Sequence, residues 1–201
     1  YVEIDNNNYS MNNFDNIIPI FIFTPEQITT KNKFISNNSI QFMIESLQDL
    51  DSELHKNNSK LHIFKGNNIT VLKKIYKQIN IDNIIFNKDY TPYAIKRDNS
   101  IEKFCKQNNI NCVMIEDYLL HPVGTLLKDN NDPYTVYTPF KNNGLKLTVE
   151  KPLKNKIKNL ISENKLKIND YIKYQTNEHI LVRGGRLNGL KQLKNIKNQK
   201  K

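Results

Sequence analysis

The sequence is poor in the residues that build disulfide-stapled, zinc-binding or membrane-spanning proteins. Its two cysteines, Cys105 and Cys112, are too few for a disulfide scaffold and stand in no pair with zinc-ligand spacing. The chain has no run of 18 apolar residues to cross a bilayer, and no charged start followed by an apolar segment as in an export signal. We therefore expect reduced thiols and a cytoplasmic or nuclear protein that is neither secreted nor bound to a membrane.

Glycine is scarce as well, with six residues in 201. The chain contains neither GxGxxG nor GxxxxGK[ST], so the usual glycine signals of dinucleotide and P-loop phosphate binding are missing. The GxSxG and HExxH motifs are also absent, and the four histidines are scattered. Common hydrolase and metalloenzyme chemistry finds no support. His62 alternates with apolar residues, which favours a packed or edge residue over a ligand.

The apolar residues that are present form strand-length runs separated by amphipathic segments. Helical spacing of apolar residues begins at Ile40 and at Val71, and a third helix is predicted over 95–107. This alternation predicts parallel strands joined by right-handed crossovers. The expected fold is α/β: a Rossmann-like doubly wound parallel sheet of about five strands, with helices on both faces, followed by a Lys-rich linker. The clearest predicted strands are Ile17–Phe23, Leu61–Phe64, Asn83–Asn87 and Cys112–Ile115.

The start of the chain does not fit this fold fully. A doubly wound sheet normally has its first strand in the middle. Only Tyr1–Ile4 precedes Asp5, and four residues are barely enough for a strand. Either sequence outside this chain supplies the central strand, or the sheet is open at its centre.

The positive charge is concentrated at the other end of the chain. The net charge is +10, and residues 151–201 carry 14 Lys and Arg against three acids, or +11, which leaves −1 for residues 1–150. Lysine outnumbers arginine 27 to 3, which is consistent both with an AT-rich coding sequence and with phosphate binding. Lysine presents a point charge rather than a bidentate fork, so any nucleic-acid binding by this tail would be non-specific. We place a domain boundary between residues 1–147 and 148–201.

Two polar and aromatic segments are candidates for a site. In an open α/β sheet, ligands bind beyond the carboxyl ends of the strands. The segment 87–93 follows a predicted strand and offers Asp89 with two tyrosines, which suits a planar polar ligand. An equally simple interpretation is a turn fixed by Pro92. The segment 132–140 has two prolines and three aromatic residues and is more typical of a docked surface loop.

Five segments together resemble the N-terminal half of DNA photolyases and cryptochromes. Their order and spacing match that family, and they cover nearly all of the chain. The segments are FIFTPEQ (21–27), FMIESLQDLDSEL (42–54), NKDYTPYAIKRD (87–98), YTVYTPFKNNGLK (134–146) and GGRLNGLKQL (184–193). The resemblance implies an α/β antenna domain over residues 1–147. It also implies an interdomain linker that leads, at the GGR segment, into the helical FAD-binding domain.

The same resemblance limits the expected activity. Family members bind FAD and the damaged DNA base in the C-terminal helical domain, which this chain does not include, and the chain has no tryptophan to serve electron transfer. The family's entry strand and its Arg-rich motif are reduced here to YVEI. The resemblance therefore implies a partner, the C-terminal FAD-binding half, through which damaged DNA would be contacted, and no catalytic residue in this chain.

Some members of the family hold an antenna chromophore in this domain, whereas many others hold none. Folate-binding members use an Asn-Glu pair where this chain has Tyr93 and Ala94, so the resemblance favours a deazaflavin or flavin over a folate. By that analogy Asp89 would accept hydrogen bonds from the chromophore, while Phe23, Phe42 and Tyr93 would wall its ring. The full set of implied chromophore-binding residues is Phe23, Pro25, Phe42, Asp89, Tyr90, Pro92 and Tyr93.

Two other interpretations remain open from the sequence. One is a non-catalytic binding module that kept the α/β fold and uses the basic tail for nucleic acid. Such binding should fall steeply with salt. The other is a remnant of a split photolyase gene, against which cooperative unfolding of the isolated chain would count.

Overall fold

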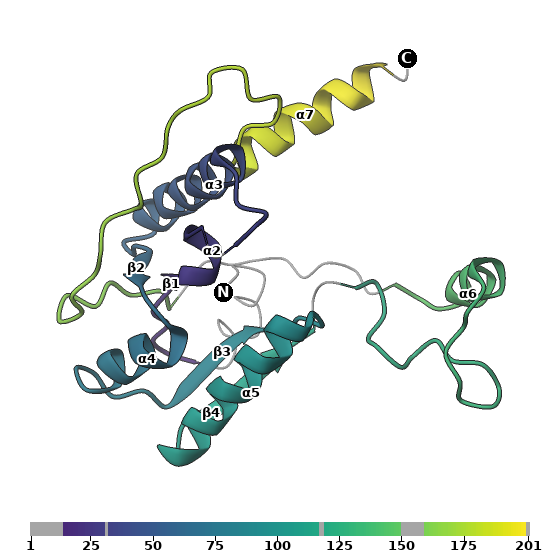
Figure 1. Ribbon diagram of the computed structural model, residues 1–201, viewed down its shortest axis with the longest axis horizontal. Coiled ribbons are helices and arrows are strands. Elements are labelled where there is room, and N and C mark those ends of the chain that lie inside the picture. Colours follow the sequence, from purple (N-terminus) through teal and green to yellow (C-terminus); the bar gives the residue numbers. More distant parts are fainter. Residues whose placement is uncertain (1–13, 31, 117–118, 150–158, 200–201) are drawn as a thin grey trace.

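The computed structural model describes residues 14–30, 32–116, 119–149 and 159–199 (Figure 1). From β1 to β4, strands are separated by helices, as the apolar pattern predicts. The elements are β1 (Ile20–Phe23), α2 (Pro25–Ile28), α3 (Asn37–Lys56), β2 (His62–Lys65), α4 (Asn68–Tyr76), β3 (Asn83–Asn87), α5 (Pro92–Gln107), β4 (Asn111–Ile115), α6 (Tyr137–Gly144) and α7 (Arg186–Gln199).

The strands form two parallel pairs. β1 pairs with β2, with Ile20 opposite His62, and β3 pairs with β4, with Asn83 opposite Asn111. The α/β class and the parallel direction are therefore confirmed. The described residues hold four strands in two separate two-stranded sheets, so a single sheet of about five strands stays a prediction.

The limits of β1 differ from the predicted strand. The prediction began at Ile17, whereas β1 begins at Ile20. Pro19 has no N–H to give to a ladder, although its carbonyl accepts from the N–H of His62 at 2.9 Å. Ile17 instead forms an isolated parallel bridge with Leu160. The apolar run therefore pairs with two segments: Ile17, before the proline, pairs with Leu160, and β1, after it, pairs with β2.

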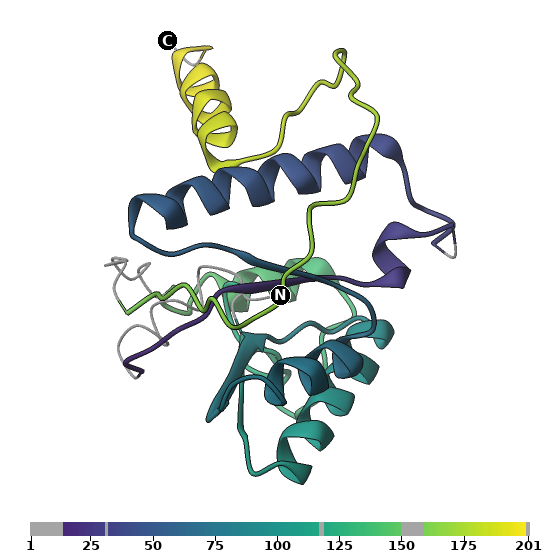
Figure 2. The same cartoon turned by 90° about the vertical axis from the view of Figure 1, so that its left-hand side faces the viewer.

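Helices cover both faces of the strand pairs, as Figure 2 shows, with α3 on one side and α4 and α5 on the other. Phe21 and Phe23 alternate with Ile20 and Ile22 along β1, so the two sets point to opposite faces. The phenylalanines pack in the cluster that contains the buried residues of α3. The isoleucines pack against the clusters formed by α4 and α5. The prediction of helices on both faces is confirmed.

The helices begin at polar caps that fix their first turns. The side chain of Asn67 accepts from the N–H of Ile69 at 3.0 Å at the start of α4. Ser36 accepts from the N–H of Ser39 at 3.1 Å at the start of α3. Each cap satisfies a backbone donor that the first helical turn leaves unpaired.

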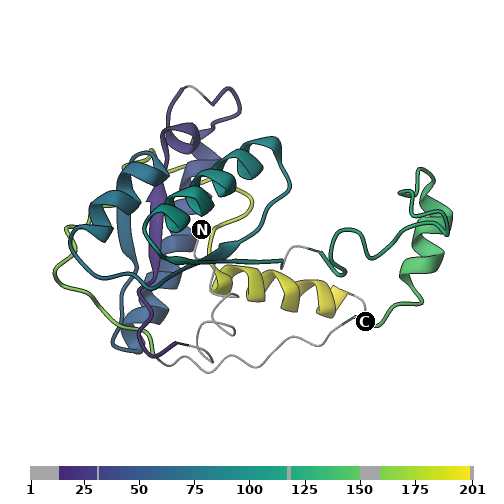
Figure 3. The same cartoon turned by 90° about the horizontal axis from the view of Figure 1, so that it is seen from below.

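Residues 119–149 form an arm that carries α6 and extends away from the strand pairs (Figures 1 and 3). Within the arm, Leu127 and Pro133 form an antiparallel bridge, and the Asn143 amide donates to the Tyr134 hydroxyl at 2.6 Å. Many of its apolar side chains are exposed, including Leu120, Tyr137 and Leu145. The arm therefore buries little of its own apolar surface.

Residues 159–185 run back along the strand pair and α3. Leu160 and Leu166 are buried there. The N–H of Asn169 donates to the carbonyl of Ile63 at 2.7 Å, and the N–H of Lys65 donates to the Asn169 side chain at 2.9 Å. Residues 159–169 are thus attached to the body by burial of two leucines and by hydrogen bonds to β2. The division at residue 147 stays a prediction.

Both cysteines are free, with Cys105 buried. No helix among the described residues is long and apolar enough to cross a membrane.

Candidate functional site

The turn between β3 and α5 is built by Asp89. Its Oδ1 accepts from the N–H of Tyr90 at 2.6 Å and from the N–H of Thr91 at 3.1 Å. The Thr91 hydroxyl then accepts from the N–H of Ala94 at 3.3 Å, and Pro92 occupies the first turn of the helix, where its missing N–H costs nothing. The Asp89 Oδ2 accepts only a long bond, 3.4 Å, from the Thr91 hydroxyl. This oxygen keeps the capacity to accept from a ligand.

Charged groups from β3 and β4 meet beside this turn. Lys88 Nζ lies 3.0 Å from Glu116 Oε1 and 5.6 Å from the centre of the Tyr90 ring. The ion pair raises the pKa of Lys88 and lowers that of Glu116. Burial raises the pKa of the Tyr90 phenol, with a further contribution from the Glu116 carboxylate. At neutral pH the residues beside this turn are therefore an ion pair, Lys88 with Glu116, and the neutral phenol of Tyr90.

Phe23 and Pro25 stand at the carboxyl end of β1. Phe23 is fully buried, with 0% of its surface exposed, and its ring meets Phe21 edge-on at 5.0 Å between centroids. Pro25 begins α2, which Thr24 and Gln27 close with a capping box. Phe23 therefore supports this end of the strand from inside the core, and its surface is not open to a ligand.

Phe42 lies on a different face of α3 from the one that packs on Phe23. Ile40, Ile44 and Leu47 are the buried positions of this part of the helix, and residue 42 is about 200° around the helix from residue 40. Its side chain is 44% exposed, and its carbonyl oxygen lies against Gly184. The structure thus brings Asp89, Tyr90, Pro92 and Tyr93 together in one turn, but it does not bring Phe42 to Phe23.

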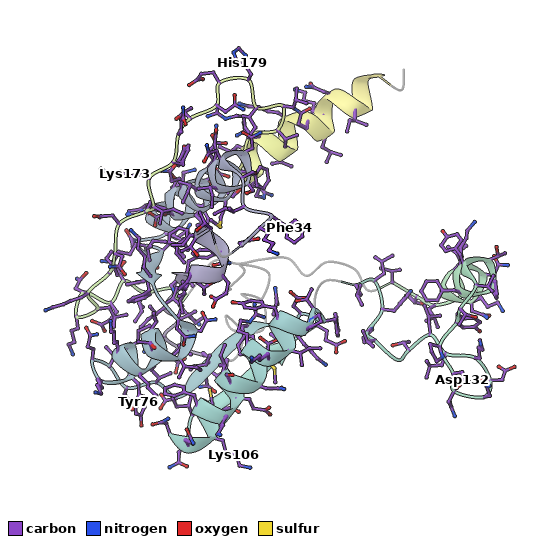
Figure 4. The ribbon with its side chains drawn as sticks, viewed as in Figure 1. Phe34, Tyr76, Lys106, Asp132, Lys173 and His179 are labelled. Carbon is purple, nitrogen blue, oxygen red and sulfur yellow. The ribbon has the colours of Figure 1, made fainter. Side chains whose placement is uncertain are left out.

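Of the aromatic residues in the turn, Tyr93 is the one open to a ligand, with 46% of its surface exposed. The second segment from the sequence, 132–140, lies in the arm, and Figure 4 shows Asp132 far from α5. A planar chromophore thus finds an exposed ring and a carboxylate oxygen at the α5 turn, which fits the chemistry of the predicted site. Whether the seven predicted residues bind a chromophore stays a prediction.

Sequence inspection missed a cleft between α3 and α7. It measures about 330 Å³ and is lined by Glu45, Asp49, Arg183 and Lys191 among others. Arg183 Nη2 lies 2.7 Å from Glu45 Oε1, and the N–H of Gly184 donates to Glu45 Oε2 at 2.8 Å. Burial opposes ionisation of Glu45, but these bonds and one from Gln41 hold its pKa below its ordinary value. Besides the ion pair of Arg183 with Glu45, Asp49 Oδ2 accepts from the N–H of Leu187 at 3.3 Å, so the cleft is a joint that attaches α7 to α3.

His62 is a second residue whose role only the structure reveals. It is fully buried on β2, which confirms that it is packed rather than a ligand. Its Nδ1 lies 3.1 Å from the carbonyl of Pro19, and its Nε2 lies 3.1 Å from the backbone N of Glu163. The neutral imidazole with its proton on Nδ1 satisfies both bonds, because Nε2 then accepts from the N–H of Glu163. His62 therefore joins β1, β2 and the returning segment.

Acid is expected to destabilise the packing of His62 between Pro19 and Glu163. Burial lowers the pKa of His62 in the folded chain, so the unfolded chain binds more protons as the pH falls below about 6.5. The stabilisation is complete above that pH and is lost as the pH falls through the lowered pKa of the folded state. Urea unfolding between pH 8 and pH 5 should show this loss in the free energy of unfolding.

Two matched variants separate His62 from the other titrating groups. His62→Gln keeps an acceptor near Nε2 without a titrating ring, and it should flatten the pH dependence between pH 7 and pH 5.5. His55→Gln changes a histidine whose side chain is 62% exposed and should leave the dependence in place. Equal pH profiles for the wild type and His62→Gln would contradict the assignment.

Within the described residues, no group of three or more His, Cys, Asp or Glu side chains is positioned to hold a metal ion.

The chain is similar to proteins of one known family. The family model described as DNA photolyase matches residues 9–157. Cryptochrome-1 of Aedes aegypti is 32% identical over 114 residues, which cover 57% of this chain and 21% of that protein. The deoxyribodipyrimidine photo-lyase of a Synechococcus strain is 24% identical over 124 residues, covering 62% of this chain and 25% of that protein. The chain thus spans about a fifth to a quarter of these relatives.

Solved structures give a closer match over more of the chain. An archaeal photolyase from Sulfolobus tokodaii, described with two FAD molecules and a novel light-harvesting cofactor, is 34% identical with a TM-score of 0.81. The match covers 92% of this chain and 41% of that chain. The Synechocystis cryptochrome superposes with a TM-score of 0.80 at 20% identity, covering 96% of this chain and 42% of that one, and it supports the fold alone.

Proposed function

This chain belongs to the photolyase and cryptochrome family as its N-terminal α/β region, and from that premise we propose that it is the antenna part of a light-driven flavoprotein. The observation that carries the proposal is the 34% identity, over 92% of this chain, to a photolyase described with two FAD molecules and a light-harvesting cofactor. Such a part would collect light and perform no bond chemistry of its own.

We propose a flavin or deazaflavin as the chromophore, in preference to a folate. The sequence has Tyr93 and Ala94 where folate-binding members have an Asn-Glu pair, and the two-FAD photolyase supports a flavin independently. When bound, the chromophore supplies light absorption and passes its excitation to FAD held elsewhere. The residues of this chain have only to bind it, orient it and exclude water.

The α5 turn is the proposed binding edge. The exposed ring of Tyr93 offers a surface for stacking, and Asp89 Oδ2 is available to accept from ring N–H groups. Pro92 and Pro25 present small apolar surfaces at the ends of β3 and β1. The half-buried Tyr90 and the buried Phe23 support these surfaces, and Phe42 lies beside Gly184 at the start of α7.

We further propose that the arm and α7 dock to a helical FAD-binding half, through which damaged DNA would be contacted in the cytoplasm or nucleus. Exposed apolar surface of this extent is typical of a protein–protein interface. On α7 four half-exposed apolar residues recur every three residues, so each neighbours the next and the set winds around about half of the helix. They are Leu187, Leu190, Leu193 and Ile196.

Chromophore binding to the purified chain tests the proposal. Titration with FAD, a deazaflavin and a reduced folate should give saturable binding of a flavin-type ring, read as quenching of its fluorescence. Tyr93→Ala should weaken that binding by about fivefold, because ring stacking contributes on the order of 1 kcal/mol. When a helical FAD-binding half is added, the bound chromophore should transfer its excitation to the FAD of that half, which is read as a further loss of chromophore fluorescence.

The control is Tyr137→Ala, which removes an exposed tyrosine from α6 in the arm and should leave flavin affinity unchanged. Preference for the folate, or no binding of any of the three chromophores, would contradict the antenna proposal. Salt-sensitive binding of DNA by the chain alone, lost on removal of residues 151–201, would favour the basic binding module instead.

A further inference from the structure

A small cavity lies between the helices α4 and α5 and the strands β1 and β3. It measures about 50 Å³, and most of its wall is apolar, with Ile22, Leu72 and Ile101 among the lining residues. The polar residues that line it are Asn68, the first residue of α4, and Arg97, in the second turn of α5. One water needs about 10–15 Å³, so the cavity has room for roughly four waters, which suits a phosphate group but not a flavin ring.

Arg97 is a largely buried cation with unused donors. Its side chain is 13% exposed, and within the described part of the chain its partner is Asp98, through a bond from Nε to Oδ1 at 2.7 Å. Asp98 Oδ2 has no hydrogen-bond partner among the described residues, so the pair is not the bidentate one that would also engage a terminal nitrogen of the guanidinium. The terminal NH₂ groups of Arg97 therefore keep their donors for a ligand.

The helices that bring these two residues together begin without a negative charge. The first N–H groups of a helix and its dipole attract anions, and acidic side chains are enriched in the first turn for that reason. Neither α4 nor α5 has an acidic residue in its first turn. Asn67 caps α4 by accepting from the N–H groups of Ile69 and Thr70, which leaves the N–H of Asn68 to a ligand. The polar end of the cavity thus offers mainly hydrogen-bond donors.

Arg97 stands one helical turn after Tyr93 on α5. Side chains four residues apart on a helix are neighbours, about 5–6 Å apart at their Cβ atoms. The exposed ring of Tyr93 is the proposed stacking surface for the chromophore, and Arg97 lines the cavity beside it. The ribityl chain of a flavin nucleotide carries its phosphate away from the ring. A phosphorylated flavin therefore has a group for each of the two residues, whereas a bare ring has one for Tyr93 alone.

We propose that Arg97 and Asn68 form an anion subsite that binds the phosphate of a flavin nucleotide, with Asp98 as the positioning residue that holds the guanidinium. The inference rests on the proposed antenna function and narrows it, because the chromophore is then a phosphorylated flavin, FMN or FAD, rather than an unphosphorylated deazaflavin. A hydrogen bond to a charged group contributes enough for the phosphate to raise the affinity at least about tenfold.

Riboflavin and FMN differ by one phosphate and test the subsite directly. In fluorescence titrations of the purified chain, FMN should bind at least about tenfold more tightly than riboflavin. Arg97→Gln combined with Asp98→Asn removes the cation without leaving a buried carboxylate unpaired. This double variant should bind FMN only as tightly as riboflavin, with its riboflavin affinity unchanged. Lys96→Gln removes an equal charge from the exposed neighbouring position and should leave both affinities as they are.

Equal affinities of the wild-type chain for FMN and riboflavin would overturn the subsite and leave the antenna proposal standing. Failure of both flavins to bind would contradict the antenna proposal. In that case, or if the double variant does not fold, NMR of the wild-type chain decides the subsite separately. Inorganic pyrophosphate should shift the Asn68 amide and Arg97 Nε–H signals saturably, and no shift would overturn the subsite. Pyrophosphate binding as tight as that of FMN would assign the subsite to a free phosphate compound and overturn its assignment to a flavin.

Discussion

Replacing Phe23 by alanine is expected to lower the free energy of unfolding by about 3–5 kcal/mol, the usual cost of removing a buried phenylalanine ring. The ring is completely buried, meets Phe21 edge-on, and packs in the cluster that joins β1 to α3. Urea unfolding followed by circular dichroism measures the loss directly. Because domains of this size are stable by about 5–15 kcal/mol, the variant should lie near the threshold of folding.

The matched control is Phe34→Ala. The Phe34 side chain is 93% exposed and projects from the segment before α3, as Figure 4 shows. Its removal should change the free energy of unfolding by less than about 0.5 kcal/mol. If Phe23→Ala were to leave stability intact while it reduced chromophore binding, Phe23 would be a wall of the binding site and its placement in the core would be wrong.

Replacing Gly184 by alanine is expected to release α7 from α3. A Cβ at residue 184 would collide with the carbonyl oxygen of Phe42, which belongs to helix backbone and has little room to move, and would come within 2.8 Å of the Ser46 hydroxyl. The backbone N–H of the same residue donates to Glu45. Overpacking of this kind destabilises a structure by about 1–3 kcal/mol, and here it would weaken the packing of α7 on α3. Trypsin should then cleave at Lys191 and Lys194 several times faster.

Gly189→Ala is the internal control, because a Cβ at that position of α7 meets nothing within 4 Å. Alanine is favoured over glycine inside a helix by about 0.5–1 kcal/mol, so this variant should resist trypsin at least as well as the wild type. Equal proteolysis rates for the two glycine variants would show that α7 does not depend on the joint with α3.

The GGR segment matched the family in the sequence, but the family match does not explain its glycines. The structure does. Gly184 allows close approach to the backbone of α3, and Gly185 adopts a φ of +99°, which side chains other than hydrogen rarely tolerate, while its N–H donates to the Ser46 hydroxyl at 3.0 Å. Ser46 lies 138 residues away from Gly184, and no local pattern links the two.

Local patterns predicted the strands and helices well where one face is buried. Asn83–Asn87 was predicted to the residue, because polar asparagines bound an apolar run. The helix predicted from Ile95 begins instead at Pro92. Apolar spacing marks only the buried face, whereas the start of α5 is fixed by Thr91 and Pro92, which that spacing does not include.

Only the part of the candidate site that lies within one short segment could be predicted from the sequence. Asp89 to Tyr93 are neighbours in sequence, so a single turn keeps them together in space. Phe42 and Phe23 are not neighbours, and the family match gave no direction to their side chains. Helical spacing would have predicted the direction of Phe42, because the buried positions Ile40 and Ile44 leave residue 42 on the other side of α3.

The sequence by itself determined the α/β class, the order of the elements, the family and the turn that could hold a ligand, because each depends on residues close together along the chain. The tertiary structure decided the rest. It paired the strands in twos, packed residues 159–185 onto the body through His62 and Glu45, and placed Phe23 inside the core. These are contacts between residues about 30 to 140 positions apart, and their formation depends on shape and backbone hydrogen bonding, which leave no periodic trace in the sequence.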